Sequence, residues 1–323
     1  MPCNLCGDSR VEVVGTHDRD GRPLRSTICT TCGLVWTNPR PAEDEVRRYY
    51  AQEYRLDYKG RATPSLRHVA RSARGALNRV RSLRPYLREG NRILDVGAGG
   101  GEVVYVLRRF GFDAHGVEPD QSYARHAREV LEVPVHDGFL QDVSFPPASF
   151  DVVTMYHSLE HVEDPHAILS RIRTWTADNG VLLVEVPNVE AHCMSPGHRF
   201  HFAHFYSFSG PALEAMGRTA GFEPVNTTTS SDGGNLVTVF RAAERAQPAA
   251  VEPGNYTRVA RSIRGHSRLG YYCSPFPYRK PFSRLRAYLA DRRAAARGTT
   301  PREVIDRVIA TESSDQDRSS TRL

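Results

Sequence analysis

The chain has 323 residues, of which 40% are hydrophobic and 25% are charged, which is ordinary for a globular protein with a sizeable buried core. No run approaches the roughly 20 consecutive apolar residues of a membrane span, so we expect no membrane partner. No secretory signal is visible at the N-terminus, which favours a cytoplasmic protein, and the net charge of +6 is compatible with an acidic partner.

Two cysteine pairs, CNLC and CTTC, stand in the first forty residues, and each pair is followed by glycine. A two-residue spacer lets both sulfurs of a turn point at one ion, and four thiolates complete a tetrahedral zinc site. Disulfides are rare in a reducing compartment, so the cysteines favour metal. We predict a zinc ribbon over residues 1–40, with structural zinc held by Cys3, Cys6, Cys29 and Cys32.

The stretch NPRPAEDEV marks the start of the main domain, and a helix rich in tyrosine is expected after it. The next helix, near residues 65–84, has an apolar stripe from Leu66 to Val80 and arginines on the opposite face. Basic faces more often keep a helix solvated than bind a ligand, so phosphate or nucleic-acid binding is the less favoured interpretation.

From Arg92 onward the pattern alternates between apolar strands and short helices, with Gly-rich turns between them. Such alternation predicts an α/β fold with a doubly wound, Rossmann-like parallel sheet. Two strand-like runs around SSDGGN favour an antiparallel hairpin that finishes the sheet. We place this domain at residues 41–246 and a basic extension, with a disordered end, at residues 247–323.

The stretch LDVGAGGG, residues 94–101, is a strand that runs into glycines and then a helix. Glycines there let the backbone approach a ligand at the carboxyl end of the strand. Glu118 ends the second strand, where a carboxylate can accept both hydroxyls of a ribose. Because Asp95 would repel a pyrophosphate, an aminoacyl nucleoside with an ammonium group fits better than a dinucleotide.

These motifs, together with SFDVVTMYHSLEHVEDP and GVLLVEVPN, resemble the class I S-adenosylmethionine-dependent methyltransferases over roughly residues 92–242. The resemblance implies a methyltransferase in which the Gly-rich turn lines the methionine side of the cofactor. It further implies that Glu118 holds the ribose, that the turn at residues 137–139 lies near adenine, and that the end of the fourth strand borders the sulfonium. The implied cofactor-binding residues are Asp95, Gly97, Ala98, Gly99, Glu118, Pro119, Asp137, Gly138, Phe139 and Tyr156.

More narrowly, the ribbon, CGLVWTNPRP and HFYSFS resemble bacterial methyltransferases of surface-polysaccharide and secondary-metabolite pathways, including nucleotide-sugar C-methyltransferases. In the sugar C-methyltransferases a Tyr, an acidic residue and a His precede the aromatic corner, whereas this chain has His201, Ala203 and His204. The loss of tyrosine and carboxylate weakens proton removal from carbon. We therefore expect O-methylation of a sugar, nucleotide sugar or secondary metabolite, with sugar C-methylation as an alternative.

The stretch HRFHFAHFYSFS, residues 198–209, supplies the first candidate base, His204, with His157 second and His201 third. A neutral imidazole can accept a hydroxyl proton at cellular pH. Packing of His204 against the backbone is equally compatible with the pattern. Metal binding ranks last, because no carboxylate or cysteine stands in the stretch. In HSLEH we expect Glu160 and His161 to tie the loop to the next helix.

An RNA methyltransferase that grips nucleic acid through the ribbon and the arginines is a second alternative. The ribbon itself is not notably basic, so we favour a small-molecule substrate over nucleic acid. The acceptor and the oligomeric state stay open.

Overall fold

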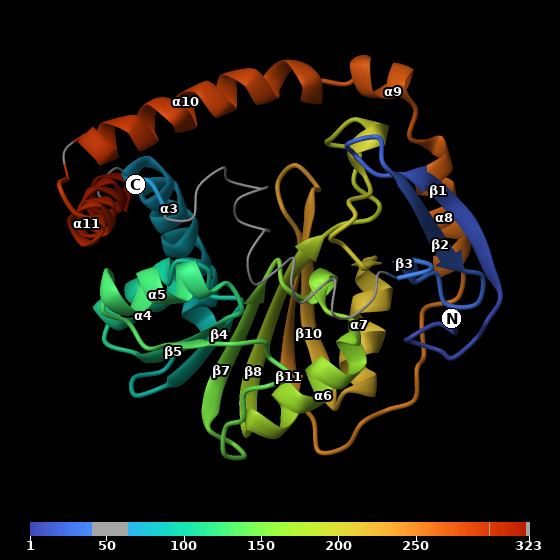
Figure 1. Cartoon of the computed structure of the whole chain (residues 1–323), viewed down its shortest axis with the longest axis horizontal. Coiled ribbons are helices and arrows are strands. Elements are labelled where there is room, and N and C mark those ends of the chain that lie inside the picture. The colour runs from blue at the N-terminus through green and yellow to red at the C-terminus, as the bar shows by residue number, and fades with distance from the viewer. Residues whose placement is uncertain (41–63, 297, 321–323) are drawn as a thin grey trace. The chain divides into compact units, whose positions relative to one another are not determined.

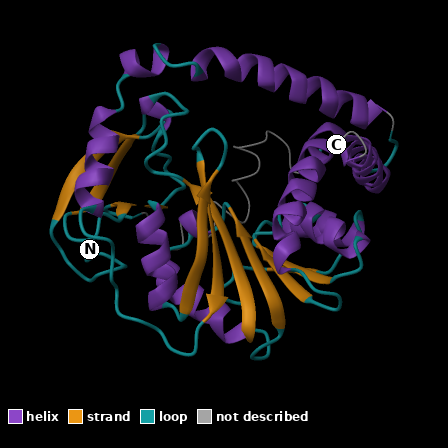
Figure 2. Ribbon diagram, turned by 180° about the vertical axis from the view of Figure 1, so that it is seen from behind, coloured by secondary structure: helices purple, strands orange, loops and turns teal. Residues whose placement is uncertain are grey.

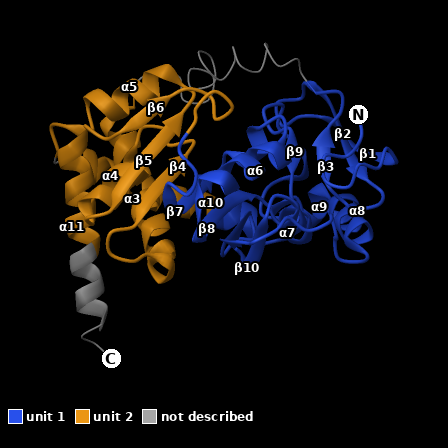
Figure 3. Cartoon of the chain, turned by 90° about the horizontal axis from the view of Figure 1, so that it is seen from below, with its two compact units in different colours: residues 1–43, 145–279 blue, residues 44–144, 280–323 orange. Residues whose placement is uncertain are grey.

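The computed structural model describes residues 1–40, 64–296 and 298–320. The tyrosine-rich helix expected after Pro41 lies outside these residues. Two compact units are present (Figure 3): unit 1 comprises residues 1–43 and 145–279, and unit 2 comprises residues 44–144 and 280–323. The three domains expected from the sequence, and the two boundaries between them, stay predictions.

In unit 1 the N-terminal segment forms a small antiparallel sheet (Figure 1). Its strands lie in the order β1 (Val11–His17), β2 (Pro23–Cys29), β3 (Val35–Thr37) and β9 (Tyr206–Ser207). The fourth strand comes from the aromatic stretch of residues 198–209, with Trp36 opposite Tyr206. Long-range pairing thus joins the ribbon to a segment about 170 residues further along the chain.

Unit 1 also contains β7 (Phe150–Tyr156), β8 (Thr176–Pro187), β10 (Phe222–Thr229) and β11 (Asn235–Ala242). β7 and β8 are parallel, whereas β10 and β11 form the expected antiparallel hairpin. Helix α6 (Pro165–Trp175) packs on β8, and α7 (Gly210–Thr219) packs on β10 and β11 (Figure 2). Asp164 caps α6 as predicted, since its carboxylate accepts the amide of Ala167 at 2.9 Å.

Unit 2 contains the parallel strands β4 (Arg92–Val96), β5 (Asp113–Glu118) and β6 (Val135–Asp137). Helices α4 (Glu102–Arg109) and α5 (Gln121–Glu129) follow the first two strands. Their apolar faces are buried, as the alternating pattern predicts. The carboxyl ends of all three strands therefore lie at one edge, where the loops that follow them meet.

The large sheet has seven strands in the order β10-β11-β8-β7-β4-β5-β6. Five strands are those of a doubly wound sheet, and the hairpin finishes one side. The predicted α/β, Rossmann-like sheet with an antiparallel terminal hairpin is confirmed, as is the small N-terminal sheet with its four-cysteine cluster.

Helices make up most of the C-terminal extension: α8 (Asn255–Gly265), α9 (Arg268–Tyr272), α10 (Phe276–Ala296) and α11 (Pro301–Ser320). In unit 2, α11 packs on α3 (Leu66–Leu83), and Val304, Ile305 and Val308 of α11 are buried. Helix α11 therefore continues into the segment expected to be disordered. The arginine face of α3 also differs from the expectation of a purely solvated face, since Arg74 pairs with Asp291 and Arg81 with Glu312.

Candidate active site

The two cysteine pairs form a single cluster in unit 1, called the cysteine cluster below: Cys3, Cys6, Cys29 and Cys32. Each pair turns in the same way, because the glycine after it has a φ near +75° and its amide donates to the carbonyl of the first cysteine. The Sγ atoms of Cys3 and Cys32 are 3.5 Å apart, as are those of Cys6 and Cys29. A tetrahedral zinc with bonds of about 2.3 Å separates its sulfurs by roughly 3.8 Å, so the cluster fits this ion.

The ionisation of the four cysteine thiols also favours a bound zinc ion. Hydrogen bonds from Cys3 and Cys32 lower the pKa of Cys29, whereas the pKa of Cys32 is raised by its bonds to Cys29 and Cys3. One thiolate thus opposes ionisation of its neighbours, and a divalent cation would allow all four to ionise together. The zinc site stays an inference from the donor set.

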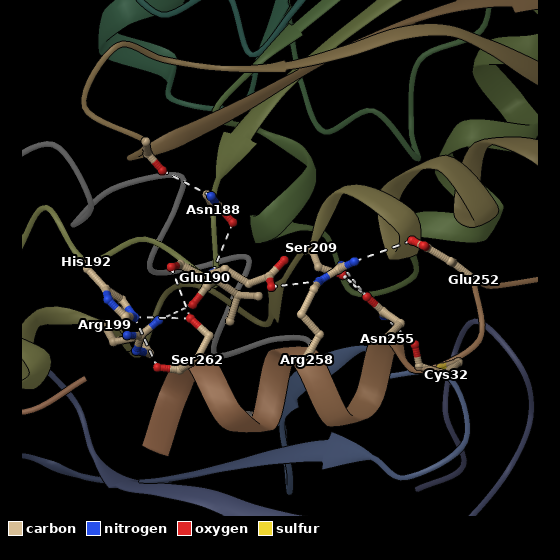
Figure 4. A network of polar contacts seen from close by, with 12 residues as sticks. Cys32, Asn188, Glu190, His192, Arg199, Ser209, Glu252, Asn255, Arg258 and Ser262 are labelled. Atoms are coloured by element: carbon tan, nitrogen blue, oxygen red, sulfur yellow. Dashed lines mark hydrogen bonds and ion pairs between the residues drawn. The ribbon is translucent and has the colours of Figure 1, made fainter. Parts of the chain in front are cut away.

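A buried amide joins the second cysteine turn to the rest of unit 1 (Figure 4). The side chain of Asn255, on α8, donates to the carbonyl of Cys32 at 2.7 Å and accepts from the hydroxyl of Ser209 at 3.0 Å. Ser209 is the residue before α7 and has no exposed surface. A Cβ on Gly33 would lie 2.6 Å from the amide nitrogen of Asn255, so this approach requires glycine.

In unit 2 the Gly-rich turn after β4 closes on the end of β5. The amides of Gly97 and Ala98 both donate to the carbonyl of Val117, at 2.8 and 3.0 Å. Gly97 and Gly99 have φ values of +76° and +57°, in the left-handed region that favours glycine. The turn therefore has the open backbone that close approach of a ligand requires.

Glu118 is 3% exposed and is held by two backbone amides. One carboxylate oxygen accepts from Gly99 at 2.7 Å and the other from Asp120 at 3.0 Å. These bonds fix the orientation of the carboxylate at the end of β5. The turn at residues 137–139 lies beside it, since the amide of Gly138 donates to the carbonyl of Glu118 at 3.1 Å.

The structure therefore brings most of the predicted cofactor residues together in unit 2, around Glu118. Strand register places Val96 beside Val117 and Glu118 beside Asp137. Tyr156, at the end of β7, belongs to unit 1, as do His157 and His204. The binding roles of all these residues stay predictions.

Hydrogen bonds to backbone carbonyls hold the aromatic stretch of residues 198–209 to the ribbon and to the loop after β7. Thr37 donates its amide to the carbonyl of Phe205 at 2.9 Å and its hydroxyl to that of His204 at 3.3 Å. Phe205 in turn donates to the carbonyl of Glu160 at 2.8 Å. His161 donates from Nδ1 to the carbonyl of Ala203 at 2.7 Å. Glu160 and His161 thus tie their loop to this stretch. The expected tie to the next helix stays a prediction.

His157, Glu160, His161 and His204 form what we call the histidine cluster. The ring of His204 lies edge-on to that of His161, with centroids 4.8 Å apart. One ligand atom each of Glu160, His161 and His204 lies within 4.8 Å of the others. The expectation that no carboxylate accompanies the imidazoles is therefore wrong, because the fold supplies Glu160 from outside the stretch.

The imidazoles differ in charge. Burial, followed by the nearby His161, places the pKa of His204 well below its usual value, so its ring is neutral at neutral pH. Burial also lowers the pKa of His201, to about 4. Among the described residues, none forms a hydrogen bond with a ring nitrogen of His204.

His157 carries a charge instead. Burial would lower its pKa, but the hydrogen bonds and charges of Glu160 and Glu185 outweigh burial and raise it to about 9. Its Nδ1 lies 3.4 Å from Glu160 and its Nε2 3.2 Å from Glu185. Its φ of +53° is strained for a residue other than glycine. At neutral pH His157 is therefore a fixed cation without a free lone pair.

Glu160 is 1% exposed and still ionised, because the charge of His161 and the hydrogen bond from His157 lower its pKa to about 2 against the opposing effect of burial. Glu185 on β8 and Asn235 on β11 were missed by the sequence analysis. The amide of Asn235 donates to Glu185 at 2.9 Å, so both position His157. The available signal was the carboxylate between Val184 and Val186, which interrupts the apolar run that begins at Val181.

Comparison with known proteins identifies the family to which the chain belongs. Residues 66–227, half of the chain, match the family described as methyltransferase domain. The chain therefore belongs to this family, and the resemblance predicted from the glycine turn and Glu118 is confirmed. Family membership identifies an enzyme of the methyltransferase class and supports S-adenosylmethionine as methyl donor.

Relatives include a ubiquinone biosynthesis O-methyltransferase from Azorhizobium caulinodans, 36% identical over 34% of this chain and 44% of that protein. The O-methyltransferase resE from Aspergillus sclerotiorum is 25% identical over 56% of this chain and 74% of that protein. The chain spans about half the length of the ubiquinone-pathway relatives it matches.

Among solved structures, the complex between the Haloferax volcanii Trm112 methyltransferase activator and a methyltransferase matches with a TM-score of 0.48 and 18% identity. It covers 64% of this chain and 100% of that chain. Within residues 1–40, 64–296 and 298–320, no helix is both long and apolar enough to cross a membrane.

Proposed function

We propose that the chain transfers a methyl group from S-adenosylmethionine to an oxygen atom of a small molecule: a sugar, a nucleotide sugar or a secondary metabolite. The choice of oxygen rests on His204. Its imidazole is neutral, has no hydrogen-bond partner among the described residues and lies near the ionised Glu160. One such base suffices for a hydroxyl. The O-methyltransferases among the relatives support this choice.

When bound, S-adenosylmethionine supplies an activated methyl group on a sulfonium. Glu118 and the amides of the turn at residues 97–99 would hold its ribose and methionine ends, and the side chain of Asp95 would face its ammonium group. Orientation of the acceptor is the largest contribution to catalysis, about 7–11 kcal/mol in favourable cases. A positioned base adds a factor of about 10²–10⁴.

In this proposal His204 accepts the proton of the acceptor hydroxyl, and the imidazolium that forms is stabilised by the carboxylate of Glu160. Because that carboxylate is buried and lies near the ring of His204, its charge acts on the ring at close range. His157 was the second candidate base. Because it is a cation, its role in this proposal is to keep Glu160 and Glu185 in place. We do not assign it the role of base.

The test is a screen of sugars, nucleotide sugars and phenols with S-adenosylmethionine, read as release of S-adenosylhomocysteine, with the methylated atom located by NMR. For an accepted substrate, His204→Gln should lower kcat by about 10²–10⁴ and leave the affinity for S-adenosylmethionine unchanged. His201→Gln is the matched control and should retain most activity. A methyl group on carbon would overturn the choice of oxygen, and turnover on RNA alone would overturn the small-molecule proposal.

A further inference from the structure

Helix α10 (Phe276–Ala296) has an exposed apolar stripe, made of Tyr278, Phe282, Leu285 and Leu289. Their exposed fractions are 61, 71, 55 and 41%. The spacing of four, three and four residues places them within an arc of about 60° on an α-helix. Single exposed apolar residues are ordinary, whereas four on one stripe call for an explanation.

The same helix is strongly basic. It contains six basic residues and one acidic residue, Asp291, which pairs with Arg74 of α3. None of the six basic side chains forms a hydrogen bond or ion pair with another described residue. They are Arg279, Lys280, Arg284, Arg286, Arg292 and Arg293.

The residues of α10 that contact α3 show which side of α10 faces α3 and which side carries the apolar stripe. Arg67 lies over the ring of Tyr288 at 4.7 Å, and Arg74 reaches Asp291, so this side of α10 faces α3. Arg279, Arg286 and Arg293 recur every seven residues on the opposite side, beside the apolar stripe. The apolar stripe thus points away from α3, and the arginines that border it have no ion-pair partner among the described residues.

We propose that this face of α10 lies on an anionic membrane surface, with the four apolar side chains inserted among the lipids and the arginines on their phosphates. A helix that lies in the interface combines apolar residues on one side with Lys and Arg beside them. Anionic lipid attracts such basic residues, and the long arginine stems can follow the apolar layer while their charge stays with the headgroups. The sequence expectation of no membrane partner rested on spanning length, which this mode of binding does not need.

Two other occupants fit less well. A second copy of α10 would bring six further cations close, and the stripe covers only two heptads, fewer than a stable coiled coil needs. RNA would use the arginines but would leave Leu285 and Leu289 exposed to water. An anionic lipid surface satisfies both the charge and the apolar side chains.

The experiment is co-sedimentation of the full chain with vesicles of phosphatidylcholine alone or mixed with phosphatidylglycerol. Binding should require phosphatidylglycerol and weaken with salt. The double variant Phe282→Ser, Leu285→Ser should bind about tenfold more weakly or worse. Each Arg→Gln change at residues 279, 286 and 293 should weaken binding about fivefold.

Val225→Ser, at an exposed valine of β10, and Arg245→Gln are matched controls that should bind like the wild type. Circular dichroism and S-adenosylmethionine affinity check that each variant is folded. Absence of binding to anionic vesicles, or equal binding by the variants, would overturn the proposal. A concentration-dependent dimer that Phe282→Ser abolishes would assign the stripe to a second copy. Binding to duplex RNA that only the arginine variants lose would assign it to RNA.

Discussion

The cysteine cluster and the histidine cluster lie in the same unit, and each gathers ligand-type side chains closely enough to hold an ion. The cysteine cluster contains four groups that can only become negative. In the histidine cluster the ionised Glu160 faces the protonated His157, so opposite charges are already paired. The neutral His204 stands beside this pair.

This difference teaches what each cluster needs. Four thiolates repel one another unless a cation joins them, so we expect the fold of the ribbon to depend on an ion. In the histidine cluster His157 and Glu160 balance each other in charge, and we propose that the neutral ring of His204 accepts a proton. The unbalanced charge of the cysteine cluster therefore favours an ion there over one at the histidine cluster.

Removal of zinc should have the largest effect. Cys29→Ser, or a strong chelator, should unfold the ribbon, because structural zinc contributes on the order of 10 kcal/mol to folding. We expect loss of bound zinc by mass spectrometry and faster amide exchange over residues 198–209, which pair with β3. The affinity for S-adenosylmethionine should persist, since the Gly-rich turn and Glu118 belong to unit 2.

Cys273→Ser, at an exposed cysteine outside the cluster, is the control and should keep its zinc. The comparison fails if Cys29→Ser still retains one zinc per chain. That result would place the ion at the histidine cluster.

Glu160→Gln should have the next largest effect. The substitution leaves the imidazolium of His157 with one carboxylate instead of two, in a half-buried position. Removal of one partner of a buried ion pair costs about 3–5 kcal/mol. Urea unfolding should show this loss at neutral pH. Glu132→Gln, which breaks the exposed ion pair with Arg302, should cost about 0–1 kcal/mol. Equal losses for the two variants would mean that Glu160 is not charged.

The two clusters also differ in how far the sequence reveals them. The cysteine ligands come from two short motifs whose glycines mark the turns, so all four could be named before the fold was known. The histidine cluster was predicted in part, because HSLEH and the aromatic stretch each supply imidazoles. Their meeting depends on the pairing of β3 with β9 and on the register of β8 with β11, which bring in Glu185 and Asn235. No local pattern encodes contacts of that kind.

The fold itself was more predictable. Alternating strands and helices, the cap at Asp164 and the hairpin around SSDGGN all depend on neighbours in sequence, and the structure confirms them. The sequence did not predict helix α11, because its C-terminal end is polar. Val304, Ile305 and Val308 are buried where α11 packs on α3, a contact distant in sequence.

A pH series sharpens the account of His157. Because its folded pKa is raised to about 9 from an ordinary value of about 6.5, protonation stabilises the fold fully below about pH 6.5. That contribution is lost as the pH rises through about 9. His157 is partly exposed, so we expect only about 1 kcal/mol from it. The stability difference between the wild type and His157→Gln should therefore shrink between pH 6.5 and 9, as measured by urea unfolding. A difference that does not change with pH would show that His157 is neutral.

Asn255→Ala tests whether the cysteine cluster acts beyond the ribbon. The variant leaves the carbonyl of Cys32 and the hydroxyl of Ser209 without this partner in a buried position, at a cost of about 1–3 kcal/mol. Because one of these groups belongs to a cysteine turn, zinc should also pass more readily to a competing chelator. Asn226→Ala, at an exposed position of β10, is the matched control and should change neither quantity. If stability falls while zinc release stays the same, Asn255 supports α7 and α8 only, and the ion is held by the two cysteine turns alone.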